Sequence, residues 1–130
     1  MFRDTTTFSS FSVDDLAAAK EFYGQTLGLD VSEMSEGLSL KVAGGGNIFV
    51  YPKSDHVPAT FTVLNFQVDD IDEAAQELRS KGVELESLAG DIETDEDGIF
   101  RGRDQGKGPD IAWFKDPAGN FLSILRSPRG

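Results

Sequence analysis

The chain carries the motif FSVDDL at residues 11–16 and carries it again, as FQVDDI, 55 residues later at 66–71. Each copy begins with alternating apolar residues, which is typical of a strand. Each ends in two aspartates before an apolar residue, which is typical of a helix start. Glycine, which commonly ends helices, follows both predicted helices at Gly28 and Gly82. The repetition predicts two similar units that bury apolar faces.

A second echo marks the end of each unit. GNIFV at residues 46–50 resembles GNFLS at residues 119–123, an offset of 73 residues rather than 55. The difference predicts an insertion of 18 residues in the second copy, within the polar, glycine-rich and aspartate-rich segment 89–109. Two units are too few for a solenoid, so we expect a paired arrangement with pseudo-twofold symmetry.

Apolar alternation and turn residues predict the same order of elements in both halves. The expected strands lie at residues 8–13, 31–33, 38–42 and 48–51 in the first half, and at 61–68, 83–88, 111–115 and 120–126 in the second. One helix starts at Asp14 or Asp15 and the other covers about 70–81. The order strand–helix–strand–strand–strand, found twice, predicts an α+β fold: a curved, mostly antiparallel sheet with helices outside. We expect a single domain over 1–130, with modules at about 7–54 and 60–127.

The composition narrows the classes of function. The chain has 23 acidic and 12 basic residues, a net charge of −11, which argues against nucleic acid and anionic membranes as partners. It has no cysteine, which excludes disulfides, thiolate nucleophiles and cysteine-ligated zinc. No apolar run resembles a signal peptide or approaches the ~20 residues of a membrane span, so we expect a cytoplasmic protein.

Two motifs resemble a known family. The opening VDDL-x3-K-x-FY-x3-LGL at residues 13–29 and the turn DPAGN at 116–120 are similar to those of the vicinal oxygen chelate superfamily, which includes glyoxalase I, extradiol dioxygenases, fosfomycin-resistance enzymes and bleomycin-resistance proteins. The resemblance covers residues 8–126. It implies two βαβββ modules, a cleft on the concave face of the sheet, and a homodimer.

The resemblance also implies where a metal would bind. In metal-dependent members, His or Glu occupies four inward-facing positions, which correspond here to Phe8, Val50, Val63 and Ser123. A shift by one residue brings in Ser9, Phe49, Leu64 and Leu122, which are no better as ligands. A divalent metal needs lone pairs from nitrogen or oxygen, and phenylalanine and valine have none. We therefore expect no metal and no cofactor.

Strand alternation extends this assignment to a candidate binding face. If Phe8 and Val63 face the cleft, Ser10, Ser12, Asn65 and Gln67 do too, while Phe11, Val13, Phe66 and Val68 face the helices. In glyoxalase-like members the residue three before the Asp of the Asp-Pro turn lines the pocket; here it is Trp113. The candidate ligand-binding residues are Phe8, Ser10, Ser12, Val50, Val63, Asn65, Gln67, Ile111, Trp113, Phe121 and Ser123. Such a cleft suits a planar or amphiphilic small molecule. The alternative is that Phe8 and Trp113 only fill the core of a barrel.

Three weaker signals lie outside this face. His56, the only histidine, stands in the proline-bounded linker and is expected to be a surface loop residue or to lie at a pocket rim. The segment from Glu93 to Gly98 resembles half of a calcium loop but lacks flanking helices. We expect segment 89–109 to be a mobile loop over the cleft, in which Arg101, Arg103 and Lys107 could meet an anionic group.

The leading hypothesis is a metal-free protein that binds and sequesters a small organic molecule, as bleomycin-resistance-like members do. An enzyme related to lyases or dioxygenases, with a non-standard site, is the alternative. A third possibility is a structural or interaction module that has lost ligand binding. The expected partners are a small-molecule ligand and a second copy of the chain, with no nucleic acid and no membrane.

Overall fold

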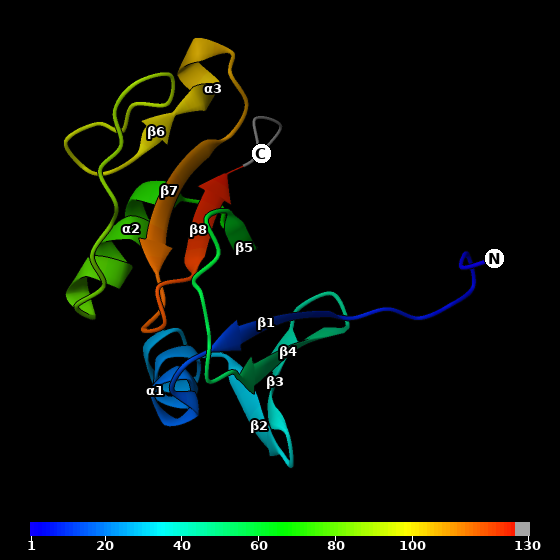
Figure 1. Ribbon diagram of the computed structural model, residues 1–130. Coiled ribbons are helices and arrows are strands. Elements are labelled where there is room, and N and C mark those ends of the chain that lie inside the picture. Colours follow the sequence, from blue (N-terminus) through cyan, green and yellow to red (C-terminus); the bar gives the residue numbers. More distant parts are fainter. Residues whose placement is uncertain (127–130) are drawn as a thin grey trace. The chain divides into compact units, whose positions relative to one another are not determined.

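The computed structural model describes residues 1–126 of the chain, which divide into two compact units. The first unit extends from Met1 to Pro58 and the second begins at Ala59. Each contains one four-stranded sheet with a helix beside it (Figure 1). Residue 127, the expected end of the second module, lies outside the described residues.

The first unit has the predicted order of elements. Strand β1 (Ser9–Val13) leads into α1 (Leu16–Glu21), which continues as a π-helical turn, η1 (Phe22–Thr26). Strands β2 (Asp30–Met34), β3 (Gly37–Val42) and β4 (Gly46–Pro52) follow. The strands are ordered β1-β4-β3-β2, with β1 and β4 parallel and the other two pairs antiparallel.

Both helices start at the second aspartate of the repeated motif. The Asp15 carboxylate accepts a hydrogen bond from the Ala18 backbone N–H at 3.1 Å, and Asp70 does the same for Glu73 at 3.1 Å. These contacts satisfy backbone donors that the first helical turn leaves unpaired. Gly28 and Gly82 follow the helices with positive φ angles of 74° and 81°, a conformation that favours glycine. The helix signals in the sequence are confirmed at both ends.

The core of the first unit lies between its sheet and its helix. Val13, Leu38, Leu40 and Val50 are at most 1% exposed, and they alternate along their strands with more exposed residues. Tyr23 of η1 is fully buried, and its ring lies 5.9 Å from that of Phe11. One face of the sheet is therefore covered by the helix, while the other carries no helix of its own unit.

The second unit differs from the prediction after its helix. Strand β5 (Thr62–Gln67) leads into α2 (Ile71–Ser80), then β6 (Phe100–Arg101), a short α3 (Gly102–Gln105), β7 (Asp110–Lys115) and β8 (Phe121–Arg126). The strands are ordered β5-β8-β7-β6, and β5 and β8 are parallel. The core face carries Phe114 and Leu122, together with Ile71, Ala75 and Leu78 of α2.

The predicted strand at 83–88 is wrong. This segment has no strand geometry, although the Glu86 backbone N–H donates to the Trp113 carbonyl at 2.8 Å. The edge of β7 pairs instead with β6, which comes from the inserted segment, through Phe100 opposite Ile111 and Arg101 opposite Asp110. Residues 83–88 alternate as a strand does and contact β7 through this hydrogen bond and through the Glu86–Lys115 ion pair at 3.6 Å, but they form no ladder with it.

Candidate functional site

The helix-free face of the first sheet carries serines and aromatic rings. Cross-strand pairing places Phe49 opposite both Ser10 and Ser39, and Tyr51 opposite Ser12. The rings of Phe49 and Tyr51 are stacked, with centroids 5.9 Å apart and planes inclined by 20°. This face therefore presents hydroxyl groups beside a stacked aromatic pair, and neither ring was among the predicted site residues.

Val50 does not belong to this face, and its predicted orientation is wrong. It lies opposite Phe11, on the side covered by the helix, and is fully buried. The neighbouring residue, Phe49, occupies the position on the helix-free face that was predicted for Val50. The reason is the hairpin before it, which pairs Val42 with Gly46 and so places Gly46 within the strand. Residues 48–51 are all apolar and carry no alternation that could have fixed the phase of the strand.

A cavity of about 460 Å³ opens on this face. Its lining residues are Phe8, Met34, Ser35, Glu36, Ser39, Asn47 and Phe49. The side chains of Phe8 and Met34 are 72% and 55% exposed, so both present apolar surface to solvent. Of the predicted residues, Phe8 lines the cavity. In β3, Ser39 stands between Leu38 and Leu40, and this alternation was the sequence signal that could have placed Ser39 in the cavity lining.

Ser12 and His56 form a contact that the sequence did not reveal. Ser12 Oγ lies 2.7 Å from His56 Nδ1, and both residues are half-buried. His56 was expected to be a surface loop residue or to lie at a pocket rim. It is a half-buried loop residue, and the linker folds back so that it contacts the end of β1.

The helix-free face of the second sheet brings six predicted residues together. Trp113 lies opposite Ser123, and Ser123 in turn lies opposite Asn65. The Ser123 hydroxyl donates a short hydrogen bond to Asn65 Oδ1. By alternation along the same strands, Gln67, Ile111 and Phe121 lie on this face as well. The Lys115 ammonium lies 5.0 Å from the centre of the Phe121 ring, so that ring already has a cationic neighbour.

Thr62 joins this face because β5 contains a bulge. The register shifts between Thr62 and Leu64, so Val63 is an extra residue in the ladder. Thr62 is therefore paired with Phe121, and its hydroxyl accepts a hydrogen bond from the Trp113 indole N–H at 3.1 Å. Strand alternation without a bulge predicted that Val63 would lie on this face and Thr62 on the opposite one. A bulge of this kind has no local sequence signal here.

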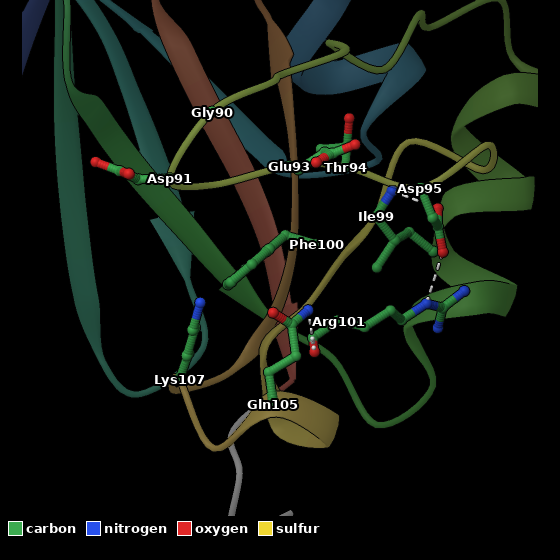
Figure 2. A pocket seen from close by; sticks show the side chains of 10 residues that line it. All are labelled: Gly90, Asp91, Glu93, Thr94, Asp95, Ile99, Phe100, Arg101, Gln105 and Lys107. Atoms are coloured by element: carbon green, nitrogen blue, oxygen red, sulfur yellow. Dashed lines mark hydrogen bonds and ion pairs between the residues drawn. The ribbon is translucent and has the colours of Figure 1, made fainter.

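The inserted segment holds a second cavity, of about 380 Å³ (Figure 2). It is lined by Gly90, Asp91, Glu93, Thr94, Asp95, Ile99, Phe100, Arg101, Gln105 and Lys107. Figure 2 shows the Arg101 side chain turned toward Asp95 and away from Lys107. Of the three basic residues proposed for an anion, Arg101 is bound to carboxylates, and the Arg103 backbone N–H donates to Asp110 at 3.0 Å. Lys107 lines the cavity.

Arg101 ties the inserted segment to α2. Its guanidinium donates to both carboxylate oxygens of Asp72, at 2.8 and 3.1 Å, and to Asp95 Oδ2 at 2.9 Å. We call Asp72, Asp95 and Arg101 the arginine clasp. The hydrogen bonds from Arg101 lower the pKa of Asp72 and, with two carboxylates as partners, the pKa of Arg101 is raised. Burial raises the pKa of Asp95, but hydrogen bonds from Ile99, Arg101 and Asp97 outweigh it, and its net shift is downward.

The same contacts account for the resemblance to a calcium loop. Asp95 Oδ1 accepts hydrogen bonds from the backbone N–H groups of Asp97 and Ile99, at 2.9 and 3.0 Å. With Oδ2 occupied by Arg101, both oxygens of Asp95 are used within the protein. The aspartate pattern is thus a turn closed by its own backbone and by an arginine.

The side chains of the two helix-free faces do not fit a divalent metal. Within residues 1–126, no group of three or more His, Asp or Glu side chains is placed to hold an ion. The observed strand pairing places Phe49 instead of Val50 on the first of these faces and Thr62 on the second. These two changes add a phenyl ring and a hydroxyl group, and neither adds an imidazole or a carboxylate. Phe8, Ser10 and Ser12 belong to the first unit and Trp113 to the second, so their meeting in one pocket stays a prediction.

Comparisons with known proteins agree with this architecture. The family model described as Glyoxalase/Bleomycin resistance protein/Dioxygenase superfamily matches residues 6–124. Among solved structures, a glyoxalase family protein from Enterococcus faecalis is 22% identical, with a TM-score of 0.67 over 96% of this chain and 99% of that one. TnmS3, an antibiotic binding protein from Streptomyces sp. CB03234, is 21% identical, with a TM-score of 0.63 over 95% of this chain and 98% of that one. No curated protein sequence gives a significant match.

Within residues 1–126, the structure has no helix long and apolar enough to cross a membrane.

Proposed function

The chain belongs to the Glyoxalase/Bleomycin resistance protein/Dioxygenase superfamily, and we propose that it binds a small aromatic or amphiphilic organic molecule without using a metal. The binding surfaces are the helix-free faces of its two sheets. Their side chains are largely aromatic rings, hydroxyls and amides, which recognise a ligand by stacking and hydrogen bonding. Sequestration requires nothing further, since no bond is made or broken.

The arrangement of Trp113 carries this proposal. Its indole is half-buried, and the hydrogen bond to Thr62 restrains the ring before any ligand arrives. Asn65 supplies an exposed amide on the same face, and Ser123, which lies between Asn65 and Trp113, is fully buried and donates a hydrogen bond to that amide. A restrained ring contributes about 0.5–1.5 kcal/mol of stacking to an aromatic ligand beyond simple burial, and it loses less side-chain freedom when the ligand binds.

The fold of an antibiotic-binding relative supports the same class of function. TnmS3 shares the architecture at 21% identity, and its name describes binding rather than catalysis. Likeness of fold leaves the ligand open, because one fold hosts many functions. The side chains named above therefore carry the argument, and the relative adds to it.

An enzyme of the same superfamily is the second candidate, and the Ser12–His56 contact is what favours it. An imidazole at 2.7 Å from a hydroxyl can accept its proton. A reaction that depends on this pair would be lost in both Ser12→Ala and His56→Gln. Ligand binding at Trp113 would be kept in both variants, which separates the two candidates.

The experiment that tests the binding function uses the single tryptophan of the chain. Titration of the full chain with a panel of planar compounds should quench the Trp113 fluorescence with at least one of them. Calorimetry with that compound should give about tenfold weaker binding by Trp113→Ala, which keeps its fold, whereas Phe2→Ala, at an exposed ring in the first unit, should bind unchanged. If no compound quenches the fluorescence and the Trp113→Ala variant is unfolded, the indole has a structural role and does not bind a ligand.

We further propose that the protein is a metal-free homodimer. Large exposed apolar side chains support an association, among them Val57 and Phe61, at 80% and 68% exposure. A stable interface of about 1,200–2,000 Å² would cover part of this surface. Sedimentation at micromolar concentration should give twice the mass of one chain, and elemental analysis should find less than one transition metal ion per chain. A monomer would contradict the proposed dimer, and one bound metal ion per chain would contradict the proposed metal-free site.

A further inference from the structure

We propose that the cavity of the first unit selects organic cations: it takes the protonated amine of a ligand whose apolar part lies on Phe8, Met34 and Phe49. This inference rests on the proposed function, because it names the chemical class of the ligand. It concerns a different unit from Trp113 and can therefore be tested separately.

The cavity walls are apolar side chains that are open to solvent. Phe8 and Met34 are more than half exposed, and Phe49 is held in place by its stacked neighbour Tyr51. Exposed apolar side chains gathered around a hollow are typical of binding surfaces rather than of an ordinary protein exterior. A cavity of about 460 Å³ has room for an amine with an aromatic or short aliphatic body.

Glu36 gives this cavity its charge selectivity. It is the one ionisable residue in the lining; the polar residues beside it, Ser35, Ser39 and Asn47, are neutral. Within residues 1–126, its carboxylate has neither an ion pair nor a side-chain hydrogen bond. Glu33, on the neighbouring strand, differs in this respect because it is paired with Lys20 at 3.2 Å.

One other charged side chain lies beside the cavity. Lys41 belongs to the same face and is paired with Asn47, which lines the cavity, but Lys41 is not itself part of the lining. The net charge of −11 attracts cations to the protein and repels anions. The faces of Phe8 and Phe49 add a favourable electrostatic contact with an ammonium group, since an aromatic ring is negative on its face.

Three probes that differ in charge test the proposal: 4-phenylbutylamine, 4-phenylbutanol and 4-phenylbutyrate. They share a phenylbutyl body and are cationic, neutral and anionic at pH 7. Binding to the full chain is followed by NMR chemical shifts and by calorimetry. The amine should bind about fivefold or more tightly than the alcohol, butyrate should bind least, and the shifts should fall on residues 34–39 and 47–49.

A matched pair of variants isolates the role of Glu36. Glu36→Gln should remove most of the amine's advantage over the alcohol and leave the affinity for the alcohol unchanged. Glu33→Gln, which removes an equal charge nearby, should have no more than a small effect, and added salt should weaken amine binding more in the wild type than in Glu36→Gln.

Three outcomes would overturn the proposal. Equal affinity for the amine and the alcohol, or equal effects of the two glutamine variants, would remove the selectivity for cations. Shifts confined to the second unit would remove the site. None of these outcomes bears on the proposed function, which depends on the titration of Trp113 and on Trp113→Ala.

Discussion

The two units repeat the same motif but close their last hairpins differently. In the first unit β3 and β4 are joined by a turn that pairs Val42 with Gly46, whereas in the second Lys115 is paired with Phe121. The turn is thus longer in the second unit. In consequence the helix-free face carries Phe49 opposite Ser10 in the first unit, and Ser123 opposite Asn65 in the second. Equal sequence motifs do not occupy equal positions when the turns before them differ in length.

The difference also explains why the two faces have different chemistry. The first has a stacked aromatic pair and an exposed apolar cavity, and the second has one restrained indole beside an amide and hydroxyls. The second unit alone carries the inserted segment, whose position against α2 is fixed by the arginine clasp. We expect this segment to be anchored at the clasp, which contrasts with the mobile loop that its composition suggested.

Replacing Val50 with serine should have the largest effect. Val50 is fully buried, so Val50→Ser leaves a cavity and buries a hydroxyl, which should lower the free energy of unfolding by about 2–4 kcal/mol. Phe49→Ser, one residue away on the other face, should cost much less and remove the aromatic wall of the cavity. Urea denaturation of both variants compares them. Equal losses would mean that the two faces of β4 are not distinct.

Breaking the arginine clasp should have the next largest effect. Arg101→Gln removes the cationic partner of Asp72 and Asp95, and we expect it to lower stability by about 1–2 kcal/mol, a modest value because the carboxylates are partly exposed. Hydrogen exchange should become faster in residues 89–101 and stay unchanged in the first unit. Lys53→Gln, which breaks the exposed pair with Asp55, is the control. Unchanged exchange in Arg101→Gln would show that other contacts hold the segment.

Acid should weaken the second unit through the same clasp. Because folding lowers the pKa of Asp72 and Asp95, their contribution is complete above the unfolded pKa of about 4 and is lost as the pH falls through the folded values. The urea midpoint of the wild type should therefore fall between pH 5 and pH 2 more steeply than that of Arg101→Gln. Parallel curves for the two proteins would contradict this linkage.

Thr62→Val should have the smallest effect on stability. It keeps the shape of the side chain and removes the acceptor of the Trp113 indole N–H, at a cost of about 0.5–1 kcal/mol. The indole should then reorient more freely, which time-resolved fluorescence anisotropy measures. A planar ligand should bind two- to fivefold more weakly, since the ring is no longer held in place. Unaltered anisotropy would show that packing alone holds the ring.

Much of the fold follows from signals that act over a few residues. Asp15 and Asp70 cap the helices that they were predicted to start, and Gly28 and Gly82 follow their ends. The alternation in β1 placed Ser10 and Ser12 on the face away from the helix. The family resemblance pointed to Trp113 and Ser123, and alternation added Asn65; strand pairing places the three on one face of the second sheet. Helix caps, helix ends and strand alternation depend on backbone geometry that neighbouring residues set. They can therefore be predicted from a short stretch of sequence.

Other features required the folded chain, because they depend on contacts between distant segments. The phase of β4 follows from a hairpin register, and the placement of Thr62 follows from a bulge beside Val63. The edge strand of the second sheet comes from the inserted segment and not from residues 83–88. His56 meets Ser12 across 44 residues, and Arg101 meets Asp72 across 29. A local pattern determines which residues form a strand or begin a helix. Which faces become binding surfaces is decided by strand pairing and loop closure, where a shift of one residue exchanges buried and exposed side chains.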